Sequence, residues 1–174
     1  MDSLIHSLRD VTIRSISVSE MNNNVYLLTS KSTGAQLLID AADDLPAIQQ
    51  LLQDSAADTA ATPKLARIAT THQHWDHVRA LPELVAVSGG ATTSAGADDA
   101  DALPVPVDVR LGHGDVERFD GFEITAVHLR GHTQARSLSC TRIRTDLPTF
   151  SVETRCFREA SATHRTILHA SLLC

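Results

Sequence analysis

One short segment constrains this chain more than any other: residues 71–77 read THQHWDH, with three histidines and one aspartate. It directly follows a stretch with strand character, KLARIAT. In extended backbone His72 and His74 project to one side, while Asp76 and His77, at the turn into the next helix, can face a neighbouring point. Zinc accepts imidazole and carboxylate ligands, and open α/β sheets hold their sites in loops at the carboxyl ends of strands. The segment therefore predicts a site for two adjacent cations; the alternative is a solvated, histidine-rich loop.

A second candidate ligand, His132, stands in Gly131-His132-Thr133, again directly after a predicted strand. A single histidine is weak evidence on its own. Together with the first cluster, however, a third imidazole arriving from another strand end would complete a three-histidine site like those of catalytic zinc centres. We interpret His128 as structural and His113 as part of a turn, and we expect Trp75 to pack against its neighbours.

The hydrophobic pattern predicts strands and helices that alternate along the chain. Gly34 can supply the positive φ of a hairpin turn, and Asp43 and Asp44 are candidate helix caps. The predicted strands cover 11–18, 24–29, 35–40, 64–70, 107–111 and 122–129; the predicted helices cover 45–53 and, with an interruption at Pro82, 78–87. The Ala/Thr/Asp-rich stretches 55–62 and 91–102 are interpreted as surface connections. This order predicts a layered α/β sheet with helices on its faces.

Charge and composition exclude several classes of protein. The 15 Lys and Arg residues against 21 Asp and Glu leave a net charge of -6, which argues against nucleic acid and anionic membranes as partners. No apolar run approaches the ~20 residues of a membrane span, so we expect a cytoplasmic protein. The three cysteines (Cys140, Cys156 and Cys174) have neither the number nor the spacing of a disulfide framework or a zinc ribbon.

The segment THQHWDH resembles the H-x-H-x-D-H signature of the metallo-β-lactamase superfamily. Three further segments resemble family motifs in the same order: NNNVYLL, LLID, and LGHGDVERFDGFEITAVHLRGHT, which ends in G-H-T. The resemblance covers roughly residues 11–133. It implies an α/β fold of four layers, an αββα sandwich, with a dinuclear metal site at one edge. The first half of that sandwich is largely present in the chain and the second half is incomplete.

The resemblance also implies the ligands and the reaction. By position, His72, His74 and His132 would hold one metal ion, Asp76 and His77 would contribute to the second, and Asp40 would support the ligands from behind. The implied cofactor is zinc, two ions in the intact family, with iron or manganese as alternatives. The implied activity is metal-assisted hydrolysis of a small-molecule substrate, in which Asp76 both ligates and orients the attacking water.

Among substrates, thioesters of the glyoxalase II type come first, and lactones, β-lactams and phosphodiesters stay open. Two functions of other classes also stay open. One is an iron-dependent oxidoreductase of the persulfide-dioxygenase kind, which would use His72, His132 and a later carboxylate around a single iron. The other is a non-catalytic remnant that binds one metal ion or none. The sequence does not predict the oligomeric state.

The composition changes abruptly at Thr133. Residues 1–133 hold all 8 glycines and a net charge of -9, whereas residues 134–174 hold no glycine and a net charge of +3. The tail also departs from the family, which continues after G-H-T with P-G-S and later an S/T-G-D motif. We therefore divide the chain into a metallo-β-lactamase-like domain (1–133) and an aberrant, poorly ordered tail (134–174), and expect impaired activity.

We interpret the tail as an out-of-frame translation of the family's own second half. Back-translated in the shifted frame with permitted bases, PTFSVETRCFREASAT (148–163) gives HLFSGDALFPGGVGN, which contains the missing G-D element. The same shift turns QARSLSC into PGSVALL, the expected continuation of G-H-T. This hypothesis implies that adding one base near the Thr133 codon opens a continuous family-like frame. The alternative is a divergent but genuine C-terminal segment.

Overall fold

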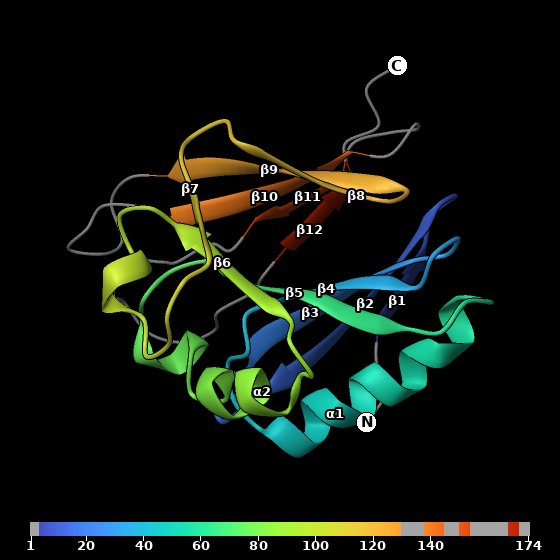
Figure 1. Cartoon of the computed structure of the whole chain (residues 1–174), viewed down its shortest axis with the longest axis horizontal. Coiled ribbons are helices and arrows are strands. Elements are labelled where there is room, and N and C mark those ends of the chain that lie inside the picture. Colours follow the sequence, from blue (N-terminus) through green and yellow to red (C-terminus); the bar gives the residue numbers. More distant parts are fainter. Residues whose placement is uncertain (1–3, 130–137, 145–149, 154–166, 171–174) are drawn as a thin grey trace.

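Two β-sheets lie face to face, and two helices cover the outer face of the larger sheet (Figure 1). This arrangement is seen in a computed structural model that describes residues 4–129, 138–144, 150–153 and 167–170. Three layers, helices, sheet and sheet, are therefore present in these ranges. They correspond to three of the four layers of the predicted αββα sandwich. In the described part, no helix is long and apolar enough to cross a membrane.

The larger sheet has seven strands in sequence order. They are β1 (Leu4–Ser7), β2 (Val11–Val18), β3 (Asn23–Ser30), β4 (Ala35–Ile39), β5 (Lys64–Thr70), β6 (Thr92–Gly96) and β7 (Val109–Leu111). The first four strands form an antiparallel meander, and β4 to β7 are parallel. Because parallel strands end at the same edge of a sheet, the loops that follow β4, β5 and β6 meet there.

The second sheet has the order β12-β11-β10-β9-β8 and is antiparallel throughout. Its strands are β8 (Val116–Phe119), β9 (Phe122–Leu129), β10 (Leu138–Arg144), β11 (Phe150–Glu153) and β12 (Ile167–Ala170). The last three strands belong to the segment predicted to be a poorly ordered tail. The proposed boundary at Thr133 lies outside the described residues, as does most of the rest of that segment, so this division of the chain stays a prediction.

The helices connect the parallel strands and cover one face of the larger sheet. They are α1 (Leu45–Asp54) and α2 (Leu81–Val87), with the short 3₁₀ helices η1 (Ser55–Asp58), η2 (Trp75–His77) and η3 (Ala100–Ala102). As predicted, Asp44 caps α1: its side chain accepts a hydrogen bond of 3.1 Å from the Ala47 N–H. Pro46 lies in the first turn, where a missing N–H breaks no helical hydrogen bond.

The strands at the centre of the larger sheet are buried on both faces, so alternate residues feed two separate cores. Leu27 and Leu38 face the helices and pack with Ile48 and other apolar residues. Leu28 and Leu37 face the second sheet and pack in a core that includes residues of β9. The alternation seen in the sequence therefore fixes which residues lie between the sheets.

The structure confirms most of the predicted elements and corrects three. The helix predicted over 78–87 begins at Leu81, because the preceding residues form the turn η2 and Pro82 fits only the first helical turn. The segment 91–102, expected on the surface, contains the buried strand β6. In 55–62, Ser55 is fully buried and Asp58 forms an ion pair with Arg14, with the side-chain atoms 2.6 Å apart.

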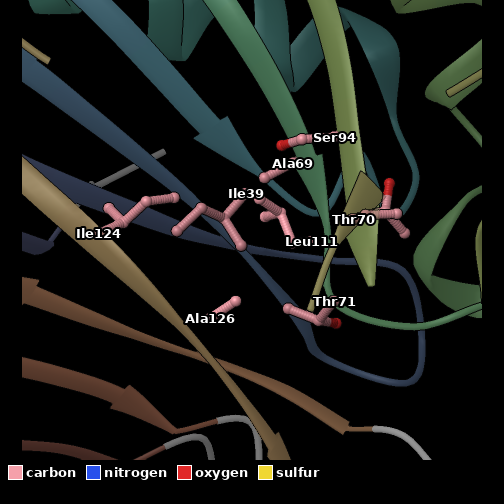
Figure 2. A pocket seen from close by; sticks show the side chains of 9 residues that line it. Ile39, Ala69, Thr70, Thr71, Ser94, Leu111, Ile124 and Ala126 are labelled. Atoms are coloured by element: carbon pink, nitrogen blue, oxygen red, sulfur yellow. The ribbon is translucent and has the colours of Figure 1, made fainter. Parts of the chain in front are cut away.

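A buried ion pair joins the two sheets. The Arg67 guanidinium of β5 lies 3.1 Å from a Glu117 carboxylate oxygen of β8, and only 19% and 8% of these side chains are exposed. Burial raises the pKa of Glu117, and the charge of Arg67 opposes that rise. A small cavity of about 10 Å³ lies elsewhere between the sheets. Figure 2 shows residues that line it, Ala69 and Thr71 on one side and Ile124 on the other. It has room for about one water molecule.

We predict that Glu117→Ala lowers the free energy of unfolding by about 3–5 kcal/mol, because it leaves the Arg67 guanidinium buried without its partner. The matched control is Glu123→Ala, which removes a pair with the exposed Arg118 (3.6 Å) and should cost less than about 1 kcal/mol. Urea denaturation of both variants measures the difference. Equal losses would show that the ion pair does not hold the sheets together.

Candidate metal centre

The candidate site lies at the edge where β4, β5 and β6 end. Asp40 follows β4, the segment 71–77 follows β5, and Asp99 follows β6 by three residues. His72, His77, Asp40 and Asp99 are all buried. The parallel strands thus bring together side chains from three separate parts of the sequence.

Asp40 is the centre of the hydrogen bonds at this edge. Its backbone has a φ of 59°, a left-handed conformation that aspartate tolerates better than most residues, and its N–H donates to the Ala69 carbonyl at 2.9 Å. The carboxylate accepts from the Thr71 N–H at 2.8 Å and from the Thr71 hydroxyl at 2.7 Å. It also lies 2.9 Å from His77 Nδ1. Asp40 therefore ties the end of β4 to both ends of the histidine loop.

These contacts determine which ring nitrogens carry hydrogen. Burial by itself raises the pKa of Asp40, but His77 and the hydrogen bonds lower it further, so the group is an ionised carboxylate that can only accept. His77 Nδ1 must then donate to Asp40. The Thr71 hydroxyl gives its one hydrogen to Asp40, so it must accept from His72 Nδ1, which lies 3.0 Å away. Both Nδ1 hydrogens are thus directed toward the protein, and in the neutral ring Nε2 is the nitrogen that can bind a ligand.

The first candidate pair is His72 and His74. The Nε2 atom of His72 lies 3.1 Å from the Nδ1 atom of His74. Two nitrogens on one tetrahedral zinc ion, each at 2.0–2.1 Å, are about 3.3–3.4 Å apart. The spacing of the pair therefore fits a shared cation with little movement.

The second candidate pair is His77 and Asp76. His77 Nε2 lies 3.8 Å from an Asp76 carboxylate oxygen, and the His72 and His77 rings are 4.2 Å apart between centroids. The Asn23 side chain donates to the carbonyl oxygen of Asp76 at 2.8 Å and to its carboxylate at 3.0 Å. Burial raises the pKa of Asp76, but Asn23 and His77 lower it further, so Asp76 stays ionised, as a metal ligand must be. Asp76 caps neither α2 nor η2.

The structure thus brings together five of the six predicted site residues: Asp40, His72, His74, Asp76 and His77. The sixth, His132, lies outside the described residues. Within the ranges that the structure describes, no three metal-binding side chains gather around one point. The described geometry therefore offers two half-sites, each with two donor atoms. His128, interpreted as structural, has its Nε2 atom 3.1 Å from the Leu111 carbonyl oxygen, and its N–H donates to His113, which lies in a turn as predicted.

The predicted packing of Trp75 against its neighbours is limited, because most of its surface is exposed. In the tight turn of η2 the neighbouring His77 faces inward and Trp75 faces outward, with 60% of its surface exposed. The Arg79 guanidinium lies over the Trp75 ring, 5.4 Å from its centroid, and pairs with Asp43 at 3.0 Å. Trp75 therefore forms part of the outer rim of the candidate site.

Three residues of the site, Asn23, Thr71 and Asp99, were not predicted. Asn23 contacts Asp76, 53 positions away, and only the motif NNNVYLL offered a signal for it. Thr71 precedes the cluster and is recognisable only through its bonds to Asp40 and His72. Asp99 follows β6, a strand that the sequence pattern did not reveal.

We predict a specific pH dependence for the metal-free protein. Burial lowers the pKa of His77, but Asp40 outweighs it and the net pKa is raised. The charged pair of His77 and Asp40 therefore stabilises the folded chain fully below about pH 6.5. This stabilisation is lost as the pH rises through the elevated pKa of His77. Melting temperatures from about pH 6 to about pH 9 should show that the stability gap between the native chain and His77→Gln narrows with rising pH. Parallel curves would contradict the His77–Asp40 pairing.

A family model described as "Metallo-beta-lactamase superfamily" matches residues 18–147. Among curated relatives, the hydroxyacylglutathione hydrolase of Jannaschia sp. (strain CCS1) is 39% identical over 112 residues, which are 64% of this chain and 40% of that protein. The hydroxyacylglutathione hydrolase of Bradyrhizobium sp. (strain BTAi1 / ATCC BAA-1182) is 36% identical over the same shares. The match thus covers about two fifths of the length of these relatives.

Solved structures agree on the fold. A metallo-beta-lactamase from Cronobacter sakazakii, a HARLDQ motif mutant, superposes with a TM-score of 0.66 and 21% identity, covering 81% of this chain and 60% of that one. The class B3 di-zinc metallo-beta-lactamase LRA-12 from an Alaskan soil metagenome gives a TM-score of 0.61 and 18% identity, over 80% of this chain and 57% of that one. The family match over most of the chain, the shared architecture and the histidine loop lead to one conclusion: this chain belongs to the metallo-β-lactamase superfamily.

Proposed function

We propose that the chain is a zinc-dependent hydrolase that acts on small thioesters of the glyoxalase II type. Two observations support the substrate class. The curated relatives at 30–39% identity are hydroxyacylglutathione hydrolases, and the family match over residues 18–147 includes the described part of the candidate metal centre. The acidic net charge of -6 fits a small-molecule substrate better than a nucleic acid. We further propose that the protein works in the cytoplasm.

The metal-dependent part of the proposal depends on the imidazole and carboxylate atoms of the candidate centre. His72 and His74 would hold one zinc ion together with His132, and Asp76 and His77 would contribute to a second. The supporting observation is that Asp40 and Thr71 accept the Nδ1 hydrogens of His77 and His72, which leaves the Nε2 atom of each ring as the nitrogen that can bind a metal ion. When bound, zinc would lower the pKa of a water molecule toward neutrality and would itself polarise the substrate carbonyl.

The chain's own residues set the geometry of that reaction. Asn23 fixes the Asp76 carboxylate with one hydrogen bond and its backbone carbonyl with another, so the free carboxylate oxygen can accept a hydrogen bond from the attacking water. Asp40 holds the His77 ring from the opposite side. Asp76 is therefore the proposed catalytic residue, and Asp40 and Asn23 position the groups that act.

A second candidate, a remnant with impaired or lost activity, is favoured by one observation. The segment after Thr133 departs from the family pattern. The family match itself continues to residue 147. We propose that the activity is lower than that of the curated relatives. The family motifs that supply further ligands after His132 have no counterpart in the sequence of this chain.

We predict that the purified chain retains zinc and that His72→Ala weakens zinc binding at least about 100-fold, since even residues behind the ligands contribute 10- to 100-fold.

Asp76→Asn should abolish any hydrolysis of a hydroxyacylglutathione thioester while changing the melting temperature of the metal-free protein little. Asp120→Asn, an exposed carboxylate in a turn, is the matched control. Metal analysis and a thioester assay measure both effects.

Two proteins serve for comparison. One is the Jannaschia relative, and the other is the product of a gene with one base added at the Thr133 codon. Higher activity in the frame-restored version supports impairment by the tail, and equal activity contradicts it. A chain that holds no zinc contradicts the metal-dependent proposal. A purified protein that contains near-stoichiometric iron and takes up oxygen would contradict the hydrolase proposal and support an iron-dependent oxidoreductase.

A further inference from the structure

Two buried carboxylates lie at the edge where the parallel strands end, and they differ in one respect. Asp40 accepts hydrogen bonds from Thr71 and His77, and its pKa is lowered. Asp99 is fully buried, and no donor among the described residues lies within 3.5 Å of either carboxylate oxygen in good geometry; weak hydrogen bonding from Gln73 lowers its pKa only in part. Burying a carboxylate without donors costs stability, so the position of Asp99 needs an explanation.

The turn around Asp99 does not depend on this side chain. The Asp99 N–H donates to the Gly96 carbonyl at 3.0 Å, and its own carbonyl accepts from the Ala102 N–H at 3.1 Å. Asp99 precedes η3, but its carboxylate makes no capping hydrogen bond there. The backbone therefore forms this turn, and the carboxylate is available for another role.

The groups that act on Asp99 belong to the histidine loop. Burial raises the pKa of Asp99; Gln73 and the charge of His74 oppose that rise, and the neighbouring Asp98 adds to it. Positive charge beside His74 favours the ionised Asp99 carboxylate, and the carboxylate in turn attracts a cation bound there. A cation shared by His72 and His74 would bring such charge.

We propose that Asp99 is a positioning residue of the metal centre: through Gln73 and His74, its buried carboxylate increases the affinity of the histidine loop for a divalent cation. The inference rests on the metal-binding part of the proposed function. The cost of burying Asp99 in the metal-free protein is then offset when a cation is bound. Asp99 acts through the loop and is not itself placed among the ligands.

Removing the Asp99 charge should weaken zinc binding and, at the same time, stabilise the metal-free protein. Asp99→Asn keeps the shape of the side chain and removes its charge. It should weaken zinc binding about 10- to 100-fold, the usual effect of residues behind metal ligands. It should also raise the melting temperature of the metal-free protein by about 2–4 °C, because an uncompensated buried charge is gone. A residue that only supports the local fold would lower both quantities together.

The test is a titration with zinc alone in competition with a chromophoric chelator, followed by thermal unfolding of the metal-free proteins. Asp120→Asn is the control, since it makes the same change at an exposed turn outside the candidate site and should alter neither quantity. Asp99→Ser, a smaller uncharged variant, should repeat the loss of zinc affinity if Asp99→Asn does not fold.

The outcomes separate this inference from the proposed function. A native chain that binds no zinc contradicts the proposed function, and the role of Asp99 falls with it. Native binding that Asp99→Asn leaves unchanged, or that Asp120→Asn weakens equally, overturns the role of Asp99 alone. A loss of metal-free stability in Asp99→Asn, parallel to the loss of affinity, also overturns it and makes the residue purely structural.

Discussion

The candidate centre depends on one buried carboxylate, that of Asp40, and on the donors that surround it. The Thr71 N–H, the Thr71 hydroxyl and His77 Nδ1 all lie within 2.9 Å of its two oxygens. Since a carboxylate only accepts, this arrangement fixes the hydrogen positions on His77 directly and on His72 through Thr71. The imidazoles are thus oriented before any ligand arrives, which reduces what binding must reorganise.

The fold supplies the place for this carboxylate. Four parallel strands end at one edge of the larger sheet, and the left-handed backbone at Asp40 turns its carboxylate under the loop that follows β5. One apolar core on each face of the sheet, together with the ion pair between Arg67 and Glu117, holds this edge against the second sheet. The chemistry therefore rests on loops whose ends are fixed by buried strands, as is general for α/β sites.

Much of this organisation could be predicted from the sequence because it is encoded locally. The strands β2, β5 and β9 have the predicted bounds, since each is a run of alternating or continuous apolar residues. The histidine loop was predicted because its candidate ligands are close in sequence. The resemblance to a known family added Asp40, whose contacts with His77 span 37 positions.

What could not be predicted depends on contacts between distant parts of the chain. The strand β6 is built from Thr, Ser, Ala and Gly, small residues that pair between β5 and β7 without the bulky apolar pattern of a typical buried strand. Trp75 is an apolar residue whose exposure follows from the tight turn around it. Asn23 and Asp99 owe their places to the sheet topology, which no local pattern records.

The central claim is that Asp40 orients the metal-binding imidazoles, and the most direct test is the zinc dissociation constant of Asp40→Asn. Asparagine tolerates the left-handed backbone, but its amide can donate as well as accept, so it no longer fixes the hydrogen positions. The account predicts binding about 10- to 100-fold weaker than in the native chain. In Asp44→Asn, which preserves a helix cap, binding should stay at the native value. Equal zinc affinity in Asp40→Asn and the native chain would contradict the account.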